Sequence, residues 1–111
     1  MSFFDSDIVR AEVAQVQEIQ QEIYIASMRY PLMTPQQKIE HLDKMQELLE
    51  KQKILHARIK LSDDGEAKEM LEKMKKTAES LGVPKDVTMD DLFKQMQAIL
   101  DSMKSNIQRA A

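Results

Sequence analysis

Apolar residues recur at steps of three, four and seven along almost the whole chain, which is the spacing of one face of an α-helix. Three short connections interrupt this pattern, and they carry all the glycines and prolines of the sequence. The pattern predicts helices over approximately residues 6–30, 35–60, 66–81 and 89–107. With two glycines and three prolines, the chain has few of the turn residues that sandwiches and barrels need.

Local signals predict where these helices begin and end. Thr34 and Gln37 stand three residues apart in the arrangement of a capping box. Asp5 is the expected N-cap of the first helix, and Gly82 is placed to stop the third. Gly65 is expected to make the turn between the second and third helices.

The end of the first helix is apolar on nearly every side, because Tyr24, Ile25 and Met28 lie off its main stripe. A helix that is apolar all round is usually covered all round. We therefore expect a homodimer or a higher homo-oligomer. The candidate interface with a second copy or another partner comprises Val16, Ile19, Ile23, Tyr24, Ile25, Met28 and Tyr30.

Together these features predict one all-α domain over residues 1–111, folded as an antiparallel bundle of four helices. The first two helices are expected to be long and the last two shorter. At 1.5 Å per residue, the first pair would extend on the order of 10 Å past the second. We expect dimerisation through the long helices to cover this overhang.

Composition narrows the classes of function. The chain has no cysteine, which excludes disulfides, a thiol nucleophile and thiolate metal sites. A net charge of −3 disfavours nucleic-acid partners unless basic residues gather on one face. The basic residues between Lys51 and Lys76 could form such a patch, but acidic residues are interleaved with them. No run approaches the roughly 18 apolar residues that span a bilayer, and the N-terminus lacks a secretory signal. A cytoplasmic location without membrane association is expected.

Candidate chemistry is sparse. His41 and His56 are 15 residues apart on one predicted helix, too far to bind one ion within a chain. His56 has two interpretations: a partly buried histidine, which is favoured, or an axial ligand of a haem. Asp63, Asp64 and Glu66 resemble a solvated helix entry more than a calcium loop. Because no glycine-rich phosphate loop or nucleophile arrangement is present, we predict no catalytic residue, no metal site, no cofactor and no enzymatic activity.

The predicted last helix places Met89, Met96 and Met103 seven residues apart on its apolar face. Methionine fills irregular gaps in cores, and it also lines promiscuous binding grooves. Burial against the bundle is the first interpretation, since Leu92, Ile99 and Leu100 alternate with these methionines. The stripe is about 100° wide, as expected for a helix covered by two neighbours.

Three segments of the sequence carry a resemblance to a known family: "SFFDSDIV", "HARIKLSDD" and "MDDLFKQMQAILDSMK". Over nearly its whole length the chain resembles a small uncharacterised family found in cyanobacteria and their tailed phages. The resemblance implies an all-helical domain with no assigned activity or cofactor. It also implies, for a phage version, a location in the cytoplasm of the infected host.

The sequence thus favours a homo-oligomeric helical interaction or adaptor protein, which for a phage version would act on a host protein. A small chaperone or assembly factor that uses the methionine-rich face is the alternative. A ligand carrier or an enzyme would require a deep polar pocket between helices.

Overall fold

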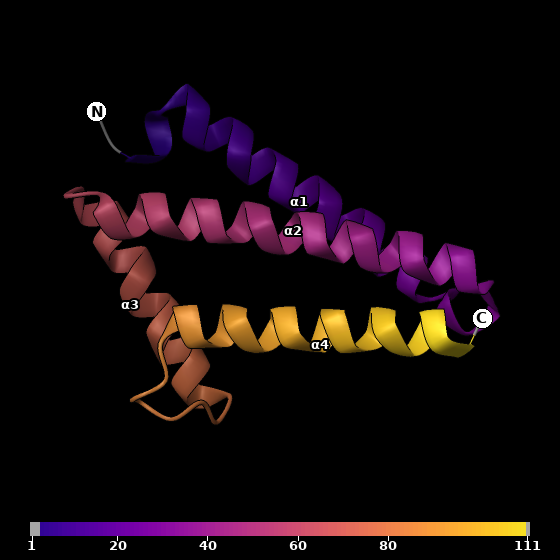
Figure 1. Cartoon of the computed structure of the whole chain (residues 1–111). Coiled ribbons are helices and arrows are strands. Elements are labelled where there is room, and N and C mark those ends of the chain that lie inside the picture. Colours follow the sequence, from indigo (N-terminus) through magenta and orange to yellow (C-terminus); the bar gives the residue numbers. More distant parts are fainter. Residues whose placement is uncertain (1–2, 111) are drawn as a thin grey trace.

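The computed structural model describes residues 3–110, which contain four α-helices, two short 3-10 helices and no strand (Figure 1). The α-helices are α1 (Asp7–Ser27), α2 (Pro35–Leu61), α3 (Gly65–Ser80) and α4 (Met89–Ala110). The 3-10 helices are η1 (Phe3–Asp5) and η2 (Tyr30–Leu32). The predicted all-α class is confirmed, while the outermost positions of the predicted domain, 1–2 and 111, lie outside the described residues.

Two of the predicted boundary signals are confirmed. The Thr34 hydroxyl accepts a hydrogen bond from the Gln37 backbone N–H at 3.2 Å, and the Gln37 side chain accepts one from the Thr34 N–H at 2.9 Å. Gly82 has φ +93°, and its N–H and that of Val83 donate to the last turn of α3. This double closure is a Schellman motif, which requires the left-handed conformation that glycine adopts freely.

Two other predicted signals are wrong. Asp5 ends η1, and Ser6 occupies the N-cap position of α1 without a side-chain capping bond. Gly65 is the first residue of α3 rather than a turn, because Asp64 caps the helix by accepting a hydrogen bond from the Glu66 N–H. An acidic side chain at the N-cap satisfies a free N–H and complements the helix dipole.

The order of helix lengths also differs from the prediction. α1 has 21 residues and α2 has 27, whereas α3 has 16 and α4 has 22. α1 ends at Ser27 instead of near Tyr30, because Pro31 lacks an N–H and disfavours helical geometry at the residue before it. α4 meets no glycine or proline after Pro84 and continues to Ala110.

α2 lies between α1 and α4 and packs against both (Figure 1). α3 begins just after the end of α2 and runs across the direction of α2 and α4 (Figure 1). Leu42 is the only large side chain that is fully buried among the described residues. The main core joins Leu42 and Leu49 of α2 to Phe93 and Leu100 of α4, with Met45, Met89, Met103 and Ile107 packed around them. Val9, Val16 and Ile19 are the buried apolar residues of α1.

Polar contacts fix the register of the three packed helices. Gln46 of α2 and Gln97 of α4 exchange two amide hydrogen bonds of 2.7 and 2.6 Å. Arg58 of α2 pairs with Glu12 of α1 at 2.8 Å. Because such bonds need matched positions on both helices, a shift by one turn would break them.

The molecule is more open than its size requires. Its principal extents are 50 × 33 × 20 Å and its radius of gyration is 16.2 Å, whereas a compact domain of this length has about 13 Å. It exposes 7954 Å², compared with about 6,300 Å² for a typical folded monomer of the same mass. The surplus of about 1,600 Å² means that part of the helical surface has no covering element within the chain.

Candidate interaction surface

An apolar groove lies between α1, α2 and α4. Its volume is about 200 Å³, and we call it the open groove. Its lining comprises Ile23 of α1; Met45, Leu48, Leu49 and Gln52 of α2; and Met96, Ile99, Leu100 and Met103 of α4. None of these side chains is charged, although charged residues make up 32% of the chain.

Helix α4 supplies the most exposed part of the open groove. Ile99 is 58% exposed and Met96 is 44% exposed, although both belong to the apolar stripe. Met89 and Met103 are half-buried and pack against the main core. Met89 thus packs against the core, Met96 lines the groove, and Met103 does both.

The opposite side of α2 and α4 has a different chemistry. Asp43, Glu47 and Glu50 of α2 follow helical spacing and are exposed there, as are Lys94 and Asp101 of α4. We call these five residues the charged side. The contrast between the two sides matters because buried interface surfaces are depleted in charged residues relative to the rest of a protein surface.

The seven residues of the predicted interface do not form one surface. Val16 and Ile19 are only 8% and 7% exposed, so they are covered by the chain itself. Ile23 lines the open groove. Tyr24, the next residue of α1, does not line it and is 65% exposed.

The remaining predicted residues lie at the far end of α1. Tyr30 is half-buried in η2, where its ring contacts the His41 ring with centroids 5.6 Å apart and has the Lys38 ammonium 5.2 Å from its centroid. Ile25 and Met28 are exposed. Ile25 lines a second, wider depression, about 770 Å³, together with Leu32 and charged side chains.

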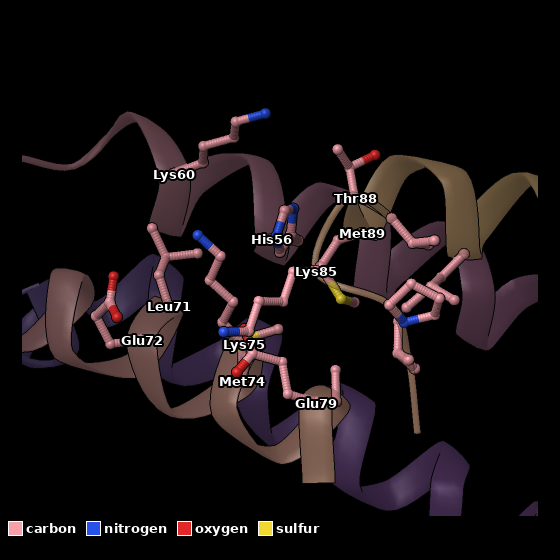
Figure 2. Close-up of a pocket in the computed structure, with 15 residues that line it drawn as sticks. His56, Lys60, Leu71, Glu72, Met74, Lys75, Glu79, Lys85, Thr88 and Met89 are labelled. Atoms are coloured by element: carbon pink, nitrogen blue, oxygen red, sulfur yellow. The ribbon is translucent and has the colours of Figure 1, made fainter. Parts of the chain in front are cut away.

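A third cavity, of about 380 Å³, lies between α3, the loop after it and the start of α4. Figure 2 shows His56 of α2, Met74 of α3 and Met89 of α4 around it. The charged side chains that line it are Lys60, Lys75 and Lys85 together with Glu72 and Glu79. Because both signs of charge are present, the lining favours no particular charge on a ligand.

His56 is the buried ionisable group at this end of the molecule. It is 8% exposed, and its ring meets Phe93 edge-on with centroids 5.7 Å apart. Burial lowers the pKa of His56, the Asp90 carboxylate opposes that change, and the Lys60 ammonium adds to it. A neutral imidazole is therefore favoured, because the low-dielectric surroundings disfavour the charged form.

Residues 1–107 match the family described as "Domain of unknown function (DUF1825)". The chain belongs to this family. No curated protein and no solved structure matches it. The resemblance noted in the sequence to a small uncharacterised family thus has its counterpart in a family that covers nearly the whole chain.

Within residues 3–110 of this DUF1825 domain, no three His, Asp or Glu side chains gather where they could hold a metal ion. None of the helices in that range is long and apolar enough to cross a membrane.

Sequence reasoning missed that the α4 stripe is partly exposed, although its width was a signal. A stripe this wide needs two neighbours, but α4 packs mainly against α2, and Met96 and Ile99 remain 44% and 58% exposed.

Proposed function

We propose that this DUF1825 domain is a non-enzymatic interaction module that pairs with a second copy of itself through the open groove. The exposed surface carries the proposal: the chain exposes about 1,600 Å² more than a typical monomer, and a standard interface takes about 800 Å² from each partner. A second copy of the same shape would remove enough of this area from water to stabilise a dimer.

The groove favours a protein partner over a small molecule. Its volume of about 200 Å³ is below the roughly 300 to 1,000 Å³ of pockets that hold drug-sized ligands. Its lining includes Gln52 as the one polar side chain. Apolar side chains from a partner helix fit such a groove, since they need no charged counterpart.

In this proposal the antiparallel helical bundle expected from the sequence is completed by the second copy. The apolar stripe of α4 obtains its second neighbour from the partner instead of from α1 or α3. The interface then includes Ile23 of the long helix α1 and Met45 of the long helix α2, as well as α4.

An adaptor needs another surface for a different protein. The depression lined by Ile25 and Leu32 meets the open groove at Ile23, but no residue of α4 lines it, and Glu22, Arg29 and Lys44 stand around it. Mixed apolar and charged lining is typical of the rim of transient interfaces. Together with the resemblance to cyanobacterial and phage proteins, this surface supports a role in the host cytoplasm, where the dimer binds a host protein.

Two matched substitutions on α4 test the dimer. We expect Ile99→Glu to be monomeric at concentrations where the unmodified chain is dimeric, because it brings two carboxylates into an apolar contact. Ala98→Glu, one residue away and facing the side of Lys94, should remain dimeric. Light scattering coupled to chromatography measures the mass, and circular dichroism checks that both variants stay helical. A chain that is monomeric at every concentration would refute the proposal.

A small chaperone is the alternative, favoured by the exposure of Met96 in the groove. Such a protein keeps its apolar surface available to clients. The two functions differ in the native state: a chaperone binds an apolar dye strongly, whereas a dimer that buries the groove binds little. Strong dye binding that Ile99→Glu does not increase would favour the chaperone.

A further inference from the structure

The apolar stripe of α4 is covered by α3 at one end only. Met89 and Leu92, at its start, line the cavity that they share with Leu71, Met74 and Ala78 of α3 (Figure 2). Further along α4, the stripe lies in the open groove, which no residue of α3 lines. Helix α3 therefore stands at one end of the surface that a partner would use.

The position of α3 restricts how two copies can meet. If the α4 helices ran parallel across the contact, both α3 helices would lie at the same end and compete for one space. If they run antiparallel, each α3 lies beyond the end of the partner's exposed stripe. A two-fold axis perpendicular to α4 gives this second arrangement, and closed two-fold pairs are the commonest oligomers.

Resting on the proposed function, we infer that two copies pack α4 against α4 in antiparallel orientation, around a two-fold axis that passes near Ile99. Ile99 lies midway along the exposed stretch between Met96 and Met103. The partner's stripe then fills the open groove, and the two α3 helices stand at opposite ends of the dimer.

The chemistry of α4 suits such an axis, because residues close to a two-fold axis meet their own copies. A charged residue there would face the same charge, which is destabilising. The residues that flank the stripe at helical spacing, Gln95, Ser102 and Asn106, are exposed and uncharged. In the antiparallel arrangement Gln95 lies opposite Ser102 of the partner, and amide and hydroxyl groups can pair because both donate and accept hydrogen bonds.

The charged residues of this part of α4 are engaged elsewhere. Lys104 pairs with Asp43 of α2, and Asp101 accepts a hydrogen bond of 2.9 Å from Gln97. These contacts direct charge away from the groove. The inferred contact therefore needs no charged group to be removed from water.

Cross-linking tests the orientation directly, because the chain has no cysteine of its own. We expect Met96→Cys and Met103→Cys, mixed and treated with a short bismaleimide, to give mainly links between position 96 of one copy and position 103 of the other. Ile99→Cys alone should link to itself. Ala98→Cys, on the other side of the helix, is the matched control and should link weakly. Mass spectrometry of the digested products identifies each link.

The outcomes separate the orientation from the dimer itself. Strong 96–96 and 103–103 links without 96–103 links would mean parallel α4 helices and would overturn the inference. A dimer by light scattering in which Ile99→Cys does not link would also overturn it, while leaving the proposed function standing. A chain that is monomeric at all concentrations would overturn both.

Discussion

His56 shows how the surroundings of a single residue decide its chemistry in this fold. Its sequence context left two interpretations, a partly buried histidine or an axial ligand. In the structure its ring packs edge-on against Phe93 and lines the cavity between α3 and the start of α4. Lys60, one turn further along α2, pairs at 3.9 Å with Asp90, whose carboxylate raises the pKa of His56. Burial lowers the pKa of this imidazole, and both charges act on it as well.

This lowered pKa predicts a specific pH dependence. In the unfolded chain His56 titrates near the ordinary histidine value of about 6.5, whereas in the folded chain it takes up a proton only at lower pH. Its contribution to stability is therefore fully present above pH ~6.5 and is lost as the pH falls through the lowered pKa of the folded state. We expect the free energy of unfolding to fall less on acidification in His56→Gln than in the unmodified chain. Urea denaturation at pH 8 and pH 5 measures both; equal losses in the two proteins would contradict the prediction.

At the scale of elements, α3 is the helix whose placement matters most, and a glycine stands at each end of it. Gly65 opens the helix after the Asp64 cap. Gly82 follows Leu81, the C-cap, and turns the chain toward α4. The same residue type has different importance at the two ends, because only Gly82 adopts the left-handed region, with φ +93°.

Alanine substitutions at the two glycines form a matched pair. No atom lies within 4 Å of a Cβ added at either position, so neither substitution creates a clash. Gly82→Ala should lower the free energy of unfolding by roughly 1 kcal/mol through backbone strain. Gly65→Ala should raise it by up to about 1 kcal/mol, because the unfolded chain loses conformational freedom. Urea denaturation tests both, and a shift of the same sign at the two sites would refute the explanation.

At the scale of the whole molecule, charged residues are absent from the lining of the open groove. Charged side chains pair with one another outside this groove, as Glu22 of α1 does with Lys44 of α2 at 3.3 Å. Association through this groove would rely on apolar contact, which is proportional to the area removed from water.

Salt dependence follows from this separation. Salt weakens attraction between exposed charges strongly between about 0.05 and 0.5 M, but it affects apolar contacts little. We expect the dimer dissociation constant to change by less than about threefold over this range. Sedimentation equilibrium at several salt concentrations measures the constant. A steep loss of affinity with salt would mean that opposite charges hold the two copies together, which the uncharged lining of the open groove cannot do.

Much of the fold could be predicted because its signals are local. The capping box at Thr34 and the stop at Gly82 depend on residues within one helical turn, and both are found in the structure. The predicted α1 end failed at Tyr30 for an equally local reason, the proline that follows it. The predicted interface stays a prediction, but the burial of its residues was not foreseen: Val16 and Ile19 are buried inside the chain, whereas Ile99 is exposed.

The sequence by itself determined that this chain forms helices, where most of them end, and which side of each helix is apolar. The tertiary structure alone decided which apolar sides are covered. The physical reason is that burial depends on the direction in which helices pack, and residues that fill a core have the same chemistry as residues that fill an interface. Because α3 crosses one end of the molecule instead of lying along α4, Met96 and Ile99 remain exposed.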